Sequence, residues 1–191
     1  IVKWPSFTER KNFVTVGNFR HEPNWDSVLY LKNKVWPLIK AKLKNTELHI
    51  YGSYLPKKAQ QLHNPKQGFY VKGWTEDSLE TLSQYRICLS PLRFGAGIKG
   101  KLADAMLSGT PSVTTSIGAE SMFAEFNWPG IIADDPLSIA ESAVSLYDNK
   151  DKWLQSQLDG ILIINNVFSK KKNEDKFIQK LEKKINYDKK I

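Results

Sequence analysis

Sulfur, imidazole and long apolar runs are scarce in this chain. Its 191 residues include one cysteine and three histidines. A single cysteine excludes an intramolecular disulfide, and the histidines are too far apart in the sequence to form the ligand spacing of a metal site. No apolar run approaches the roughly 18–20 residues that a membrane span requires, and the first residues do not resemble a signal peptide. These absences favour a cytoplasmic protein without a metal site.

Acidic residues are outnumbered, but the excess of positive charge is uneven. The formal net charge is +8, and residues 170–191 alone contain nine lysines against four acidic residues. A nucleic-acid binder is one interpretation. However, arginines are few and the aromatic residues lie in apolar runs, so we expect no nucleic-acid partner. A solvated, amphipathic last helix explains the basic segment equally well, and a peripheral contact with the anionic inner face of a membrane is a third interpretation.

Length and composition fit one domain. With 41% hydrophobic and 25% charged residues, the chain can build one well-packed core but scarcely two. We expect residues 1–12 to form a linker or the start of the domain, residues 13–169 the domain itself, and residues 170–191 a basic C-terminal helix or tail. Cys88 falls in the apolar run of a predicted strand, so we expect it to be buried.

Strands alternate with helices along the sequence. Short apolar, β-branched runs predict strands at residues 13–17, 47–52, 68–73, 86–89, 111–116 and 130–133. Helical periodicity predicts a helix after Pro23 that Pro37 ends or kinks, and further helices at residues 57–62, 77–84, 98–108 and 136–147. This alternation predicts an α/β fold with a doubly wound, Rossmann-like parallel sheet. Ligands of such sheets bind outside the carboxyl ends of the strands.

The stretch Ser90–Met122 joins one predicted strand to the next through a glycine-containing loop and a helix. Gly95 and Gly97 let the backbone adopt positive φ and approach a bound group closely. The helix that follows presents free N–H groups and the positive end of its dipole at the same point. Lys99 and Lys101 add positive charge where a helix without a ligand favours acidic residues. We therefore predict an anion site, and the alternative is that both lysines are only solvated.

The same helix is expected to pack one apolar stripe on the sheet and to stop sharply. Gly109 can adopt the left-handed conformation that ends a helix, and Pro111 prevents its continuation. The stripe consists of Ile98, Leu102, Ala105 and Met106. In the helix at residues 77–84, the residues expected to face inward are Leu79 and Leu82.

These residues resemble the signature of retaining glycosyltransferases of the GT-B fold, a large family of nucleotide-sugar-dependent enzymes with many bacterial members. The matching residues are Pro91, Gly95, Gly97, Lys99, Lys101, Asp104-Ala105-Met106, Gly109, Pro111 and Gly118-Ala119-Glu120. Upstream segments that also resemble the family are residues 16–24, 36–37, 48–52 and 71–73. The resemblance covers approximately residues 12–169.

The resemblance implies the C-terminal, donor-binding half of a hexosyltransferase in carbohydrate biosynthesis. Such an enzyme transfers a sugar from a UDP- or GDP-linked donor with retention of configuration, needs no metal or further cofactor, and is inactive without its N-terminal domain. Lys99 and Lys101 are then the catalytic residues that stabilise the departing diphosphate. The substrate-binding residues that the resemblance implies are Gly17, Asn18, Arg20, Gly73, Trp74, Gly95, Ala96, Gly97, Ile98, Asp104 and Glu120.

The chain also departs from the family pattern. Ala96 stands where many members have glutamate, and Asp104 replaces the glutamate of the Glu-Ala-Met motif. Asn18 and Asn24 occupy the first loop, where members often carry arginine and lysine. Two alternatives to a glycosyltransferase stay open at this point: a nucleotide-sugar epimerase of the same fold, and a nucleotide- or anion-binding module without catalysis.

Overall fold

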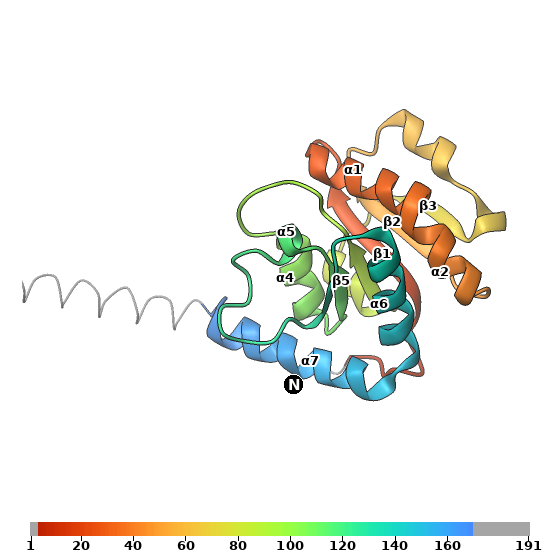
Figure 1. Ribbon diagram of the computed structural model, residues 1–191. Coiled ribbons are helices and arrows are strands. Elements are labelled where there is room, and N and C mark those ends of the chain that lie inside the picture. Colours follow the sequence, from red (N-terminus) through yellow and green to blue (C-terminus); the bar gives the residue numbers. More distant parts are fainter. Residues whose placement is uncertain (1–3, 170–191) are drawn as a thin grey trace, which may run out of the picture.

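The computed structural model describes residues 4–169, and at its centre is a six-stranded parallel sheet (Figure 1). The strands are β1 Lys11–Asn18, β2 Leu48–Ser53, β3 Phe69–Gly73, β4 Tyr85–Ser90, β5 Ser112–Thr114 and β6 Gly130–Ile132. Their order across the sheet is β3-β2-β1-β4-β5-β6. The chain reverses its direction of travel across the sheet between β1 and β4, and a crevice opens there at the carboxyl ends of the strands. The predicted doubly wound α/β fold is confirmed.

Helices cover both faces of the sheet. One face carries α1 Glu22–Tyr30, a π-helical turn Leu31–Val35, α2 Trp36–Lys42 and α6 Pro136–Asp148. The other carries α3 Ser78–Ser83 and α4 Gly100–Leu107. The last helix, α7 Lys150–Asn166, begins against the first layer, where Trp153 is buried, and reaches α4. Shorter helices are the 3-10 turns Lys57–Leu62 and Pro65–Gln67, and α5 Ser116–Ala119. In the view of Figure 1, α7 lies below α4, on which it packs through Ile163.

Successive side chains of β1 point to opposite faces of the sheet, so this one strand packs against both helical layers. Phe13 is fully buried and packs with Trp36 of α2 and Tyr147 of α6. Val14, its neighbour in sequence, points to the opposite face and joins the cluster that includes Leu82 of α3. Both faces of the central strand are therefore apolar, as expected for a strand buried between two helical layers.

Pro37 interrupts the long helical segment between β1 and β2, as the sequence predicts. It is the second residue of α2, and because the helical backbone continues from the preceding turn, its missing N–H removes one helical bond. The π-helical turn immediately before it takes up the change in backbone hydrogen bonding. Asp135 caps α6 by accepting hydrogen bonds from the backbone N–H groups of Leu137 and Ser138, both at 3.0 Å.

The segment before β1 packs against the domain through Arg10, which is fully buried. Its guanidinium donates hydrogen bonds to the backbone oxygens of Pro5 at 3.0 Å, Gly109 at 3.0 Å and Ser108 at 3.1 Å. Burial lowers the pKa of Arg10 to about 10. Arg10 therefore ties residues 5–10 to the carboxyl end of α4, where the backbone carbonyls carry partial negative charge.

Three local expectations are wrong. The helix predicted from Ile98 begins at Gly100 because Lys99 is its N-cap with a ψ of 89°, outside the helical range. Ile98 therefore lies in the loop and is 57% exposed. Leu79 is 39% exposed, since α3 turns only Leu82 inward.

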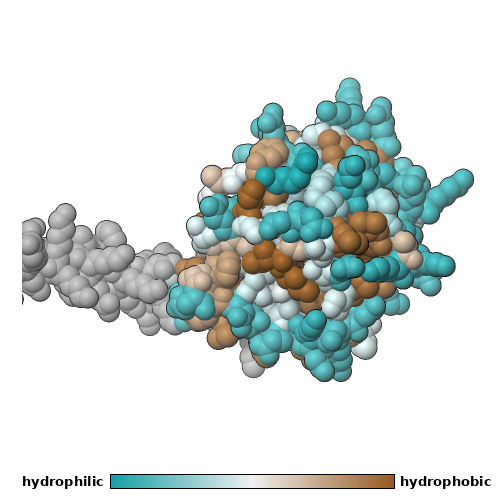
Figure 2. Space-filling model, viewed as in Figure 1, coloured by the Kyte–Doolittle hydropathy of each residue, from teal (hydrophilic) through white to brown (hydrophobic). Residues whose placement is uncertain are grey.

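Hydrophilic side chains and separate apolar patches share the surface seen in Figure 2. Within residues 4–169, no helix is both long and apolar enough to cross a membrane. Cys88 is fully buried as expected, and burial raises the pKa of its thiol to about 12. The basic helix or tail predicted for residues 170–191 lies outside the described residues.

Candidate functional site

Two adjoining pockets lie at the carboxyl ends of β1 and β4, where the sheet topology predicts a ligand. The first has a volume of about 510 Å³ and is lined by Gly17, Asn18, His21, Pro23, Asn24, Leu92, Phe94, Gly95, Ala96, Ile98, Lys99, Gly100 and Lys101. The second has a volume of about 290 Å³ and is lined by Val16, Gly17, Asn18, Gly52, Ser53, Trp74, Thr75, Ser78, Gly100, Lys101 and Asp104. We call them pocket 1 and pocket 2. They share the end of β1 and the start of α4, so one elongated ligand can occupy both.

The loop between β4 and α4 forms one wall of pocket 1. Gly95 and Gly97 adopt φ of 125° and 75°, which confirms the predicted need for glycine. Arg93 forms an ion pair with Asp26 of α1 through two hydrogen bonds, of which the one from Nε is 2.9 Å long. Thr115, which follows β5, holds the neighbouring residue Leu92 by donating a hydrogen bond from its hydroxyl to the Leu92 oxygen. The first residues of the loop are thus fixed to α1 and to the residue that follows β5.

Lys99 is the most unusual residue of this wall. Its side chain is 6% exposed, and its ammonium is buried without a hydrogen-bond acceptor among the described residues. The nearest countercharge is Glu120, whose Oε2 lies 3.8 Å from Lys99 Nζ. Taking an ammonium out of water without hydrogen bonds is costly. The start of α4 therefore has an unfilled capacity to pair with an anion.

The backbone adds further donors at the same place. The N–H groups of Leu102 and Ala103 bond to the Lys99 oxygen at 2.9 and 3.3 Å. Those of Gly100 and Lys101 have no acceptor among residues 4–169, and Gly100 lines both pockets. Free N–H groups at a helix start favour a bound anion.

Lys101 lies at the junction of the two pockets. Burial lowers the pKa of Lys101 to about 8, since the charged ammonium is less stable away from water. A bound anion would reverse this effect by stabilising the charged form. Lys101 therefore releases its proton more readily in the empty site than an exposed lysine does.

Asp104 faces pocket 2 from the next turn of α4. Its Oδ2 accepts a hydrogen bond of 3.0 Å from the Ser78 hydroxyl at the start of α3. Trp74, at the end of β3, also lines pocket 2 and is 68% exposed. An oriented carboxylate and an aromatic ring suit a ligand part that carries hydroxyls and a flat ring.

The structure brings most of the residues predicted for the site together, but four of them line neither pocket: Gly73, Gly97, Arg20 and Glu120. The Arg20 guanidinium lies 3.6 Å from the centre of the Tyr54 ring, outside both pockets. Glu120 reaches the site only through its ion pair with Lys99.

Sequence reasoning missed Ser78 and Phe94 as site residues. Ser78 enters pocket 2 because α3 packs beside α4, a contact between segments 26 positions apart in sequence. Phe94 lines pocket 1 and is 44% exposed. Its place between Arg93 and Gly95 in the glycine-containing loop was the one available signal.

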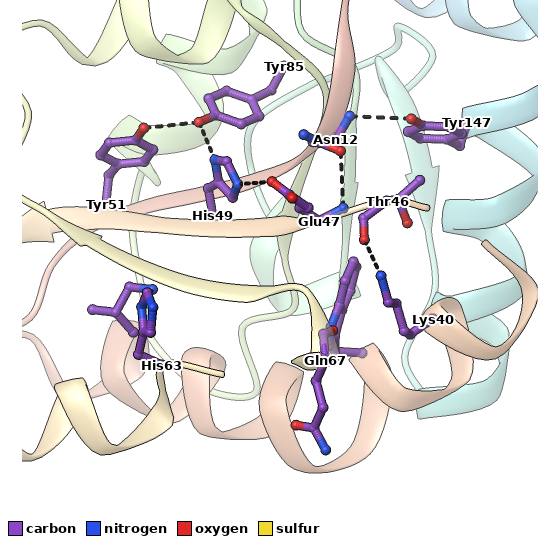
Figure 3. Close-up of polar contacts among 12 residues, drawn as sticks. Asn12, Lys40, Thr46, Glu47, His49, Tyr51, His63, Gln67, Tyr85 and Tyr147 are labelled. Carbon is purple, nitrogen blue, oxygen red and sulfur yellow. Dashed lines mark hydrogen bonds and ion pairs between the residues drawn. The ribbon is translucent and has the colours of Figure 1, made fainter. Parts of the chain in front are cut away.

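A polar cluster apart from the pockets is formed by Glu47, just before β2, with residues of β2 and β4 (Figure 3). His49 Nδ1 lies 2.6 Å from the Tyr85 hydroxyl and Nε2 lies 2.7 Å from Glu47 Oε2, while the Tyr51 and Tyr85 hydroxyls are 3.0 Å apart. Burial lowers the pKa of His49, against the opposing effect of Glu47. None of these four residues lines pocket 1 or pocket 2. Among residues 4–169, no three acidic, histidine or cysteine side chains gather into a metal site.

The fold and its paired pockets define an α/β domain with a ligand cleft at the carboxyl ends of its strands. Residues 10–149 match the model of glycosyl transferases group 1. This match covers more than half of the chain, and the chain belongs to that family. The predicted relation to GT-B glycosyltransferases is thereby confirmed.

Individual relatives are distant. An uncharacterized 44.6 kDa protein in the cps region of Klebsiella pneumoniae is 24% identical over 168 residues, which are 84% of this chain and 43% of that protein. A mutant of S. aureus TarM, solved with fondaparinux, alpha-GlcNAc-glycerol and UDP, superposes with a TM-score of 0.73 at 19% identity, over 94% of this chain and 37% of TarM. The pneumococcal O-GlcNAc transferase GtfA, solved with UDP and GlcNAc, gives 0.66 at 18% identity over the same shares. At these identities the structures show the fold, and the chain spans less than half the length of each protein.

Proposed function

We propose that this chain is the donor-binding half of a glycosyltransferase of hexosyltransferase type. It binds a UDP- or GDP-linked sugar, whose sugar is transferred to an acceptor with retention of configuration. The observation that carries this proposal is the Lys99 ammonium, which is buried without an acceptor beside the start of α4. A diphosphate supplies the charge and the acceptor oxygens that this group lacks. Membership in the family and the presence of UDP in two similar structures support a nucleoside diphosphate as the anion.

In this proposal, different parts of the nucleotide sugar lie in different pockets. The diphosphate lies at the shared start of α4, against Lys99, Lys101 and the N–H groups of Gly100 and Lys101. These groups stabilise the negative charge that grows on the diphosphate as the bond to the sugar breaks. The sugar occupies pocket 1.

The nucleoside occupies pocket 2. Asp104, held by Ser78, accepts hydrogen bonds from the ribose hydroxyls, and Trp74 packs over the base. The acceptor is bound by an N-terminal domain on the opposite side of the cleft. We place the enzyme in the cytoplasm, with residues 170–191 as a peripheral contact to the inner face of the membrane.

Calorimetric titration of uridine, UDP and GDP into the wild-type chain tests this proposal. UDP or GDP should bind. Lys101→Ala should weaken the nucleoside diphosphate far more than the nucleoside, and the loss should shrink at high salt because it is a charge-to-charge contact. Asp104→Ala should weaken both ligands by about 1.5–3 kcal/mol, as expected for a hydrogen bond to a charged group.

Lys150→Ala is the matched control, because Lys150 is exposed at the start of α7 and lines neither pocket. It should keep wild-type affinities. The proposal is overturned if neither diphosphate binds, or if Lys101→Ala and Asp104→Ala both behave like Lys150→Ala.

A further inference from the structure

Glu120 stands beside the buried cation of the site without belonging to either pocket. Its carboxylate forms the single ion pair of Lys99 within residues 4–169, at 3.8 Å, and its own side chain is 62% exposed. That separation is too long for a hydrogen bond. The Lys99 ammonium thus has a countercharge but still has no acceptor for its N–H groups.

The backbone around Glu120 is held firmly. Ala119 and Met122, on either side of it, are buried with Leu102 and Met106 of α4. Ser121 adopts a φ of 60°, which is costly for a residue with a side chain and persists only where neighbouring structure enforces it. The fold therefore fixes the backbone position of Glu120, while its exposed side chain remains able to turn toward solvent.

A diphosphate at Lys99 would meet this carboxylate. The ligand and Glu120 are both negative, and at a separation near 4 Å two like charges repel strongly even when partly screened by water. Both compete for the same ammonium. Binding must therefore displace Glu120 from Lys99.

We propose that Glu120 is a resident countercharge that occupies the place of the ligand's anion at Lys99 and competes with it. This inference rests on the proposed function. In the empty site Glu120 lowers the cost of burying the ammonium, and in the filled site it moves aside. After sugar transfer the same carboxylate competes with the departing nucleoside diphosphate and speeds its release. Glu120 is thus a positioning residue that sets the affinity and residence time of the product.

The test compares Glu120→Gln with Glu125→Gln. Glu125 is exposed in the loop that follows and has no ion pair among the described residues, so both variants remove one negative charge from the same region. UDP affinity is measured by calorimetry, and the dissociation rate by surface plasmon resonance. Glu120→Gln should bind UDP about tenfold more tightly than the wild type and release it more slowly. Glu125→Gln should change both quantities little, because an exposed charge without an ion pair contributes little. Inorganic pyrophosphate should also bind more tightly to Glu120→Gln than to Glu125→Gln.

Two further variants separate competition from general electrostatics. Glu120→Asp keeps the charge but retracts it, and should give an intermediate affinity. When Lys99 is replaced by methionine, Glu120→Gln should no longer increase the affinity for UDP appreciably, because the ammonium for which both anions compete is absent. Thermal unfolding provides a second readout. Without ligand, Glu120→Gln should melt below the wild type, because the buried ammonium loses its countercharge. UDP should raise the melting temperature of Glu120→Gln by more than it raises that of the wild type.

The outcomes are distinguishable. If the wild-type chain binds UDP or GDP and Glu120→Gln matches Glu125→Gln in affinity and dissociation rate, the inference is wrong and the proposed function stands. If neither nucleotide binds to the wild type or to Glu120→Gln, both fall.

Discussion

Lys101 illustrates at the scale of one residue how burial tunes a binding group. Its ammonium is placed where a diphosphate is proposed to lie, yet its surroundings lower its pKa to about 8. The lowered pKa reflects the cost of holding this charge away from water in the empty site. The same property ties ligand binding to pH.

Affinity for UDP should fall as the pH rises above about 8. The free protein loses the Lys101 proton near that pH, whereas the bound diphosphate raises the pKa and keeps the proton on. Binding then takes up a proton, so each pH unit above 8 should weaken UDP by up to about tenfold. Titrations between pH 6.5 and 9.5 measure the slope. Lys101→Arg, whose side chain stays charged throughout, should flatten it, and an equal slope in that variant contradicts the assignment.

At the scale of elements, two glycines in different helices should respond oppositely to one added methyl group. Gly118 of α5 lies where a Cβ would overlap the Thr114 hydroxyl, and Gly118→Ala should destabilise the protein by about 1–3 kcal/mol. Gly160 of α7 has room, with Pro129 Cβ at 3.5 Å and Met106 Cβ at 3.7 Å. Gly160→Ala should stabilise by about 0.5–1 kcal/mol through better helix propensity. Urea unfolding of the pair measures both signs, and equal effects would show that the packing of α5 is misassigned.

The polar cluster of β2 and β4 should make stability fall in acid. Burial lowers the pKa of His49 in the folded protein, whereas the unfolded chain protonates this residue near pH 6.5. The unfolded state therefore binds more protons below that pH, and the free energy of unfolding decreases from about pH 6.5 downward until the folded pKa is reached. Unfolding in urea at several pH values measures this. His49→Gln should lose this part of the pH dependence, while His21→Gln, at an exposed position, should retain it.

At the scale of the whole molecule, the proposed function requires a second domain on the acceptor side of the cleft. We expect the chain to bind UDP or GDP weakly but to transfer no sugar, because the proposed acceptor side belongs to another domain. EDTA should leave the nucleotide affinity nearly unchanged, since Lys99, Lys101 and the start of α4 supply the positive charge. Calorimetry with and without EDTA, and a product assay with a UDP sugar, check both statements. Turnover by the chain alone, or binding that is lost with EDTA and restored by Mg²⁺, would contradict them.

The order of elements could be read from the sequence because its signals are local. Alternating apolar strands and periodic helices set the parallel sheet, Pro37 marked the break before α2, and Gly95, Gly97 and Gly109 marked positions where the backbone adopts positive φ. Each of these depends on the conformational range of one residue or a short run. The loop and helix that form the candidate site were recognisable for the same reason.

Only the tertiary structure decided which charges are buried and paired. Lys99 has the same side chain as many exposed lysines of this chain, and only the folded structure makes it a buried cation without a hydrogen-bond acceptor among the described residues. The pairings of Glu120 with Lys99 and of Ser78 with Asp104 join residues 21 and 26 positions apart. No periodicity specifies such contacts, because burial and charge pairing depend on how separate elements pack, and local sequence constrains that packing weakly.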